Sequence, residues 1–426
     1  MNRRYFGLTS LLMTSKKNMK INQSRLLQNI DRYAQIGKKG AIGVERISLS
    51  EEDRIARDLL KQQMYEAGLE VYIDKMGNMI GIRKGKKDAK PVAFGSHLDS
   101  VYSGGRYDGA LGVLAALEII HTLNDHGIVT DKPLALVNFT NEEGVRFAPD
   151  MMGSHVYAHP EMLQEIYASR AYDYYDLTVE KGLENIGYKG EMEPGAIEFD
   201  SFLEIHIEQG PVLESENRDI GIVEMVQGIY WSRYVIEGQA NHAGTTPISY
   251  RKDAGYAASQ VVQFVGDYSR KPHNHVLATV GSLAFEPNTI NIVPNKATFT
   301  LDLRSTEYDT LKGAQKEIDS FIKGLVKSQG LQFTKEEMVR FAPVHFPVEM
   351  TNAVQNAAVK SQLTYKRMPS GAGHDAQMMA SVCPSTMIFI PSVNGISHNV
   401  EEYSKDQDVA NGAQVLFDAV LERAVC

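Results

Sequence analysis

The alternation of hydrophobic and polar residues divides the first half of the chain into segments of distinct periodicity. Segments 21–36 and 50–67 repeat their apolar residues at helical spacing, and the second follows a Ser-Glu-Glu start that is typical of a helix N-terminus. An apolar, buried-type strand begins at Pro91, and another spans 134–140 after a predicted helix over 111–126. Strands that are apolar on both faces and alternate with helices predict an α/β domain with a mixed, mainly parallel sheet covered by helices.

The pattern changes in the second half. Alternating, strand-like segments begin at Trp231, His275 and Lys296. Helical segments over 253–268 and 306–329 lie between and after them. The order strand, helix, strand, strand, helix, strand predicts a ferredoxin-like insertion over 226–341. The chain would then return to its first domain, which gives one domain over 1–225 plus 342–426 and a second over 226–341, as its length of 426 residues favours.

Composition narrows the class of protein and of partner. Hydrophobic residues at 43% and charged residues at 23% are close to the averages of soluble globular proteins, and no stretch approaches the roughly 20 apolar residues of a membrane span. The net charge of -9 offers no basic surface for nucleic acid. We therefore expect a small-molecule substrate, with neither nucleic acid nor membrane as a partner.

The cysteines and the N-terminus favour a cytoplasmic protein. Cys383 and Cys426 are far apart and match no metal-binding spacing, so we interpret them as free thiols in a reducing compartment. Residues 1–18 combine a basic start with only a short apolar run before further lysines. This differs from a signal peptide, and we interpret the segment as an extension, with Met19 as an alternative start.

Histidine and carboxylate residues gather at predicted strand ends and in the loops that follow them, where a hydrolytic metal centre needs its ligands. His97 ends one strand, and Asp99 would share its face and orient the imidazole. Asp108 lies in the glycine-rich GGRYDGALG, where a lone aspartate is more often a helix cap. His206 and His398 are each as consistent with a structural histidine as with a metal ligand.

The adjacent acidic residues Glu142 and Glu143 directly follow an apolar strand, in the segment NEEGVRF. A solvated acidic loop is the plain alternative. Adjacent carboxylates also have a chemical use, because one can bind a metal while its neighbour acts as a general base on water. Together with the candidates above, the pair predicts a metal site that activates water.

Several segments occur in a characteristic order: GSHLDSVYSGGRYDGALG, NFTNEEGVRF, EIHIEQGPVLE, GQANHAGTTP, NTINIVPNKATFTLDLRS, SGAGHDA and GISHN. They resemble the hydantoinase/carbamoylase branch of the M20 metallopeptidase-like amidohydrolases, and the resemblance runs from about Lys20 to the C-terminus. That branch holds N-carbamoyl-L-amino-acid hydrolases, beta-ureidopropionases and allantoate amidohydrolases. The resemblance implies a di-metal, exopeptidase-like catalytic domain and gives the inserted α+β domain the role of a lid and dimerisation domain.

The resemblance also implies a ligand set for two divalent metal ions, in which His97 and His206 flank one ion, Glu143 and His398 complete the site of the other, and Asp108 bridges them. Glu142 would be the general base. The wider superfamily of peptidases usually carries a carboxylate where this chain has His206, which favours the amidohydrolase branch. Zinc or manganese suits these ligands, as do cobalt and nickel. Asp99, His374 and Asp375 are assigned to supporting positions behind the ligands.

Four further residues are implied as contacts of the substrate. Gln209 matches a substrate-contacting glutamine of the branch, and His242 would reach across a homodimer interface to stabilise the oxyanion. Asn291 and Arg304 would hold the substrate carboxylate. These roles suit the residues, because a guanidinium pairs bidentately with a carboxylate and a tetrahedral intermediate needs a donor where its charge develops.

The sequence thus predicts a metal-dependent amidohydrolase that cleaves the carbamoyl (ureido) C–N bond of an N-carbamoyl-L-amino acid or a related small carboxylate. Allantoate amidohydrolase is the alternative enzyme, since it shares all of these motifs. A metal-stabilised binding protein without catalytic activity is the alternative outside enzymes, although such a protein would have no use for Glu142.

Overall fold

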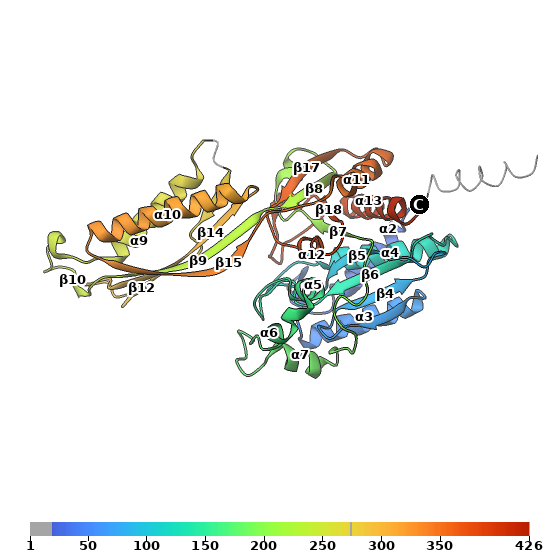
Figure 1. Cartoon of the computed structure of the whole chain (residues 1–426), viewed down its shortest axis with the longest axis horizontal. Coiled ribbons are helices and arrows are strands. Elements are labelled where there is room, and N and C mark those ends of the chain that lie inside the picture. The colour runs from blue at the N-terminus through green and yellow to red at the C-terminus, as the bar shows by residue number, and fades with distance from the viewer. Residues whose placement is uncertain (1–18, 273–274, 426) are drawn as a thin grey trace, which may run out of the picture. The chain divides into compact units, whose positions relative to one another are not determined.

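The computed structural model describes residues 19–272 and 275–425, so the segment interpreted as an extension, 1–18, lies outside the described residues. The chain divides into two compact units (Figure 1). The first runs up to Glu224 and resumes over Phe346–Met368 and from Gly373 onward, while the second comprises Met225–His345 and Pro369–Ala372. The second unit therefore takes in slightly more of the chain than the predicted insertion over 226–341, because the last of these segments joins it through space.

The first unit is built on a mixed sheet whose strand order is β8-β18-β7-β5-β6-β4-β3. Its strands are β3 (Glu70–Ile73), β4 (Met79–Arg83), β5 (Val92–His97), β6 (Leu134–Phe139), β7 (Ser201–Ile207), β8 (Ile220–Val226) and β18 (Ser385–Ile390). The central strands β18, β7, β5 and β6 are parallel, and the outer strands β8, β4 and β3 are antiparallel to their neighbours. This confirms the predicted mixed, mainly parallel sheet.

The central strands are parallel and fully buried, as expected for strands whose residues are mostly apolar on both faces. Their register aligns their carboxyl ends at one edge of the sheet. His97 is paired with Phe139, the last residue of β6, and Ile207 with Ile390 at the end of β18. Residues that end these strands, or follow them, therefore meet at this edge.

Helices complete the first unit: α2 (Gln23–Tyr33), α3 (Glu51–Glu66), α4 (Ala110–Asp125), α5 (Met152–Ala158), α6 (Leu163–Tyr167), α7 (Val179–Ile186), α8 (Val212–Ser215), α11 (Val348–Lys360), α12 (Asp375–Met379) and α13 (Asp406–Ala424). Both α4 and α13 pack on β5 and β7. Ser50 caps α3 by accepting a hydrogen bond from the backbone N–H of Asp53, as its Ser-Glu-Glu start predicts. The long helix α13 has no counterpart in the sequence prediction, because it is buried on most sides and lacks a clear polar stripe.

The second unit has the strands β9 (Gly228–Glu237), β10 (Asn241–His242), β11 (Val276–Thr279), β12 (Leu283–Glu286), β13 (Ile292–Val293), β14 (Lys296–Ser305) and β15 (Gln332–Phe341), and the helices α9 (Ala254–Ser269) and α10 (Tyr308–Ser328). Its main sheet is antiparallel with the order β11-β14-β9-β15, and β12 extends it beside β14. This is the strand arrangement of a ferredoxin-like unit. Figure 1 shows α9 and α10 lying along this sheet, with which they form a separate core.

The remaining described elements are β1 (Lys38–Lys39), β2 (Gly43–Val44), the strands β16 (Val344–His345) and β17 (Tyr365–Ser370), which both pair with β8, and 3-10 turns at Pro160–Met162, Ile248–Tyr250 and Val393–Gly395. Within the described part of the chain, no helix is long and apolar enough to cross a membrane.

Candidate metal centre

The carboxyl edge of the parallel strands brings together side chains that are far apart in the sequence. His97 is the last residue of β5, and His206 lies one residue before the end of β7. Glu142 and Glu143 follow β6, and His398 lies in the loop after β18. All of these residues therefore lie at or beyond the carboxyl ends of the parallel strands.

Asp108, in the loop before α4, is the residue that the other candidates surround. His97, Asp108 and His206 form one triad whose ligand atoms all lie within 4.8 Å of one another, and all three side chains are buried. The Nε2 atom of His206 is 3.1 Å from Asp108 Oδ1, and that of His97 is 3.7 Å from the same oxygen. This triad can hold an ion.

A second triad uses the other oxygen of Asp108. Asp108, Glu143 and His398 again place their ligand atoms within 4.8 Å of one another. His398 Nε2 is 3.5 Å from Asp108 Oδ2 and 3.4 Å from Glu143 Oε2. Because Oδ1 faces the first triad and Oδ2 the second, Asp108 has the geometry of a bridging carboxylate. In the second triad, the His398 side chain is about half exposed at 53%.

The hydrogen bonds of the two buried histidines turn their Nε2 atoms into acceptors. His97 Nδ1 is 2.9 Å from the backbone oxygen of Asp99, and His206 Nδ1 is 2.9 Å from that of Ile207. A carbonyl only accepts, so each Nδ1 carries a proton, and each ring in its neutral form keeps its Nε2 lone pair for the triad. His97 Nε2 is buried and has no hydrogen-bond partner among the described residues. A metal ion fits this nitrogen, and the tautomer suits it.

The pKa values of the three residues of the first triad are shifted in different directions. Burial lowers the pKa of His97 to about 4, so its ring is neutral near pH 7. Burial also lowers the pKa of His206, but the adjacent Asp108 carboxylate raises it by a larger amount. The resulting pKa of His206 is about 9. Burial raises the pKa of Asp108, but His206 and its other histidine neighbours outweigh burial and hold it well below its usual range. Asp108 is therefore an anion that attracts cations.

The acidic pair lies in a strongly negative environment. Burial, followed by the charges of Asp375 and Glu143, raises the pKa of Glu142 well above its ordinary value. Burial and the nearby Asp108 do the same for Glu143. Several carboxylates confined together repel one another, and divalent cations bound between them would offset that repulsion. The donor set and its electrostatics thus both fit a pair of metal ions.

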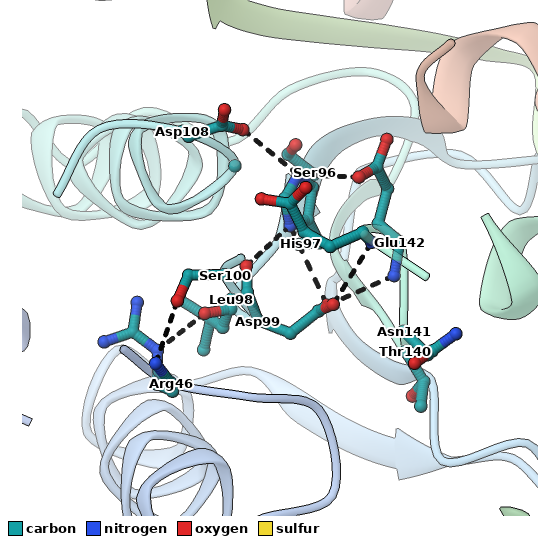
Figure 2. A network of polar contacts seen from close by, with 12 residues as sticks. Arg46, Ser96, His97, Leu98, Asp99, Ser100, Asp108, Thr140, Asn141 and Glu142 are labelled. Atoms are coloured by element: carbon teal, nitrogen blue, oxygen red, sulfur yellow. Dashed lines mark hydrogen bonds and ion pairs between the residues drawn. The ribbon is translucent and has the colours of Figure 1, made fainter. Parts of the chain in front are cut away.

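The Asp99 carboxylate holds the backbone of the acidic pair, and Figure 2 shows it beside Glu142. Its Oδ1 and Oδ2 atoms accept the backbone N–H groups of Glu142 and Glu143, each at 3.2 Å. Its carboxylate is 3.8 Å from His97 Nδ1, so the backbone oxygen of Asp99 orients the imidazole more directly than its side chain does. Glu142 Oε2 lies 3.3 Å from His97 Nε2, which puts this carboxylate beside the first triad.

His374 and Asp375 lie at the start of α12, behind the first triad. The ring centroid of His374 is 4.5 Å from that of His206. Asp375 is buried and close enough to Glu142 for its charge to raise the pKa of that residue. Gln209 instead contacts the second triad, because its Nε2 donates to Asp108 Oδ2 at 2.9 Å and is 3.4 Å from His398 Nε2.

The remaining predicted residues belong to the second unit. His242, on β10, is exposed, and its Nδ1 accepts the backbone N–H groups of Gly244 and Thr245 at 3.0 and 3.1 Å. Its Nε2 therefore carries the proton of the neutral ring and is free to donate. The backbone oxygen of Asn291 accepts the N–H of Ala243, which brings Asn291 beside His242.

Arg304 lies elsewhere in the second unit, one residue before the end of β14. Asn291 directly precedes β13 and is therefore near the start of β14 in the sequence. Its Nε and Nη2 atoms donate to Asp302, at 3.1 and 2.9 Å, and its Nη1 donates to the backbone oxygen of Gly371. The eight residue-to-residue steps from Lys296 to Arg304 span roughly 26 Å of extended strand. Within one chain, the unit therefore brings Asn291 together with His242 and not with Arg304.

Three buried charged residues near the triads were not predicted from the sequence. Arg46 donates from Nε to the backbone oxygen of Leu98 at 2.6 Å, and so supports the turn after β5 (Figure 2). Glu204 accepts from Ser96 Oγ at 2.6 Å, and Glu402 accepts the backbone N–H of Asp108 at 3.1 Å. Glu204 is two residues from His206 on a strand, so the two-residue period was a usable signal. No local pattern marks Arg46 or Glu402.

A mixed sheet that gathers two histidine and carboxylate triads at the carboxyl ends of its parallel strands defines a class, the metal-dependent hydrolases with an exopeptidase-like fold. The chain belongs to the peptidase family M20/M25/M40, whose sequence profile matches residues 93–422. This confirms the resemblance to the M20 amidohydrolases that the motifs indicate.

Known relatives span the full length of the chain. An N-carbamoyl-L-amino-acid amidohydrolase of Rhizobium meliloti is 39% identical over 409 residues, which cover 96% of this chain and 98% of that protein. An allantoate amidohydrolase of Bacillus subtilis is 31% identical over 412 residues, covering 96% and 99%. The crystal structure of an amidase of the hydantoinase/carbamoylase family from Burkholderia multivorans has a TM-score of 0.89 at 38% identity, covering 95% of this chain and 98% of that one.

Proposed function

We propose that this chain is a metal-dependent amidohydrolase that cleaves the carbamoyl C–N bond of an N-carbamoyl-L-amino acid. The observation that carries the proposal is the pair of triads sharing Asp108, with the buried Glu142 carboxylate beside them. The substrate class is supported by the relative from Rhizobium meliloti, which is named for this activity and matches over nearly its whole length.

In this proposal, His97, Asp108 and His206 hold one ion, and Asp108, Glu143 and His398 hold the other. Zinc or manganese suits this mixture of imidazole and carboxylate ligands, and cobalt or nickel is also compatible with it. When bound, the two ions would lower the pKa of a water molecule to about 7 and stabilise the charge that develops on the substrate carbonyl oxygen. The proton transfers and the contacts with the substrate are assigned to residues of the chain.

Glu142 is assigned the proton transfers. Its carboxylate lies beside His97 Nε2, which is its one ion-pair partner among the described residues, so it is available to take a proton from the attacking water. It then delivers that proton to the leaving nitrogen as the C–N bond breaks. The products of a carbamoyl substrate are the free amino acid, ammonia and carbon dioxide.

The substitution Glu142→Gln tests this role. The amide keeps the size of the side chain but cannot take the proton, so we expect bound metal to stay at the wild-type level while kcat falls by about 10²–10⁴. Glu143→Gln is the matched comparison, since the same change one residue on should lower metal content as well. Elemental analysis and ammonia release measure the two quantities. A fully active Glu142→Gln enzyme contradicts the assignment.

Gln209, His242, Asn291 and Arg304 are proposed as substrate contacts, on the strength of the family motifs. The proton on His242 Nε2 suits a donor to an oxyanion, and Asn291 beside it would act from the same side. We further propose a homodimer in which His242 serves the partner's site. Exposed apolar side chains near His242 support a contact with a second copy: Ile248 at 77%, Tyr250 at 79% and Ile290 at 102% exposure.

Allantoate hydrolysis is the second candidate, because the Bacillus subtilis relative named for it also matches over nearly its whole length. Both substrates carry a ureido group near a carboxylate, so the same residues would serve either. Metal-reconstituted enzyme supplied with N-carbamoyl-L-amino acids or with allantoate separates the two by the kcat/KM of ammonia release. Metal-dependent turnover of either one excludes a binding protein without activity.

The buried free thiol of Cys383 suits a cytoplasmic location.

A further inference from the structure

We propose that Glu402, a buried residue in the loop between β18 and α13, is a positioning residue that holds Asp108 and His398 in the geometry needed to bind an ion. The inference rests on the proposed function, since it presupposes that the second triad, Asp108, Glu143 and His398, binds metal. It assigns a task to a carboxylate that belongs to neither triad.

The Glu402 carboxylate clamps the loop that carries Asp108. Its Oε1 atom accepts the backbone N–H groups of Tyr107 and Asp108, both at 3.1 Å. Two hydrogen bonds from consecutive amides to one carboxyl oxygen fix the direction in which the Asp108 side chain leaves the backbone. The residue is only 1% exposed, so these bonds are shielded from water.

The other oxygen of Glu402 reaches the second ligand. Oε2 accepts the hydroxyl of Ser397 at 3.0 Å, and Ser397 directly precedes His398. The same hydroxyl lies 3.2 Å from Asp108 Oδ2, which is the oxygen that faces His398. Glu402 and Ser397 thus connect two ligands that are far apart in the sequence, and they do so on the side of the second triad.

Two features of the backbone agree with this clamp. His398 has a φ of 52°, in the left-handed region that a non-glycine residue keeps only when its surroundings enforce it. Gly105 lies so close to Glu402 that a Cβ at this position would be 2.1 Å from Oε1. The loop before α4 therefore has a glycine where the Glu402 carboxylate must approach.

The experiment titrates metal-free protein with Mn²⁺ by calorimetry and compares four variants with the wild type. Glu402→Ala removes the clamp, and we expect the Kd of one of the two ions to rise about 10- to 100-fold, as for other residues that support metal ligands. Glu402→Gln should stay within about threefold of the wild type, because its carbonyl oxygen can accept both backbone N–H groups and its amide can donate to Ser397. Glu401→Ala, at the exposed neighbouring glutamate, is the matched control and should bind like the wild type.

Ser397→Ala keeps the bonds of Glu402 to the backbone and removes the contacts of the Ser397 hydroxyl with Glu402 Oε2 and Asp108 Oδ2. It should weaken the same ion by a smaller factor, and it tests the proposal if Glu402→Ala does not fold, as circular dichroism would reveal. Wild-type affinity for both ions in Glu402→Ala overturns the proposal. A Glu402→Gln variant as weak as Glu402→Ala also overturns it, because charge and not position would then be the cause. If the wild type itself binds fewer than two ions, the proposed function fails, and the positioning role fails with it.

Discussion

At the scale of single residues, the site depends on which atom of each side chain faces which neighbour. The backbone oxygens that accept from Nδ1 of His97 and His206 leave both Nε2 atoms to the triads. Asp108 divides its two oxygens between the triads, with Oδ1 toward His206 and Oδ2 toward His398. The same five side chains with another tautomer or another rotamer would offer protons where the metals need lone pairs.

A glycine beside His97 gives a prediction at this scale. Gly109 has a φ of 64°, and a Cβ there would be 2.3 Å from His97 Cε1. We therefore expect Gly109→Ala to displace the imidazole and to lower metal content and kcat at least 10-fold, as when the support of a metal ligand is lost. Elemental analysis of purified protein and ammonia release measure the effect.

Gly127 provides the matched control at the other end of α4. Its φ of 61° is nearly the same, but a Cβ there would meet nothing within 4 Å. Gly127→Ala carries the same backbone strain without the clash, so it should cost only about 1 kcal/mol of stability and leave metal content unchanged. Equal loss of metal in both variants would mean that backbone strain alone is responsible.

At the scale of elements, buried charges join the strands of the site to the helices around them. Arg57, on α3, is fully buried and pairs with Asp53 one turn earlier at 2.8 Å. It also donates to the backbone oxygen of Gly77 at 2.8 Å and to Thr140 Oγ1 at 3.2 Å. Since Thr140 follows β6 and precedes the acidic pair by two residues, α3 helps to fix the strand end from which Glu142 departs.

Removal of this arginine should be costly. Arg57→Ala leaves the buried Asp53 carboxylate without its partner, so we expect the free energy of unfolding to fall by about 3–5 kcal/mol. Arg54→Ala is the control on the same helix, because the ion pairs of Arg54 with Glu51 and Asp58 are exposed and should contribute little to stability. Urea unfolding followed by circular dichroism measures both. Similar losses in the two variants would contradict a special role for the buried pair.

At the scale of the whole molecule, the chain consists of two compact units with separate hydrophobic cores. The first contains both triads, and the second contains His242, Asn291 and Arg304. The separation of His242 and Asn291 from Arg304 within the second unit agrees with our proposal that two copies of the chain contribute different residues to one substrate site.

Mixing two inactive variants tests this arrangement. Glu142→Gln retains His242, and His242→Ala retains Glu142, so a hybrid dimer has one site with both intact residues if His242 serves its partner. Random pairing would make half of the dimers hybrids, and we expect co-refolded mixtures to regain up to about a quarter of wild-type activity. Each variant refolded alone is the control. If His242 serves its own chain, no hybrid site is complete and the mixture stays inactive.

Most of the fold was accessible from the sequence, because its signals are local. Apolar runs mark β5 and β6, and helical spacing with a serine cap marks α3. The candidate metal ligands were accessible too, since strand ends and recurring motifs mark their positions. Helix α13 was not, because a helix that is buried on most sides loses the polar stripe by which a pattern is recognised.

The sequence by itself determined which residues are present at the strand ends and which family their motifs indicate. Only the tertiary structure decided how they act on one another, since Asp108, His206 and His398 meet through contacts between distant segments. It assigned the Asp99 carboxylate to the backbone of the acidic pair, and it revealed Glu402 behind Asp108. Such contacts depend on side chains meeting in three dimensions, and no periodicity or spacing along the chain encodes them.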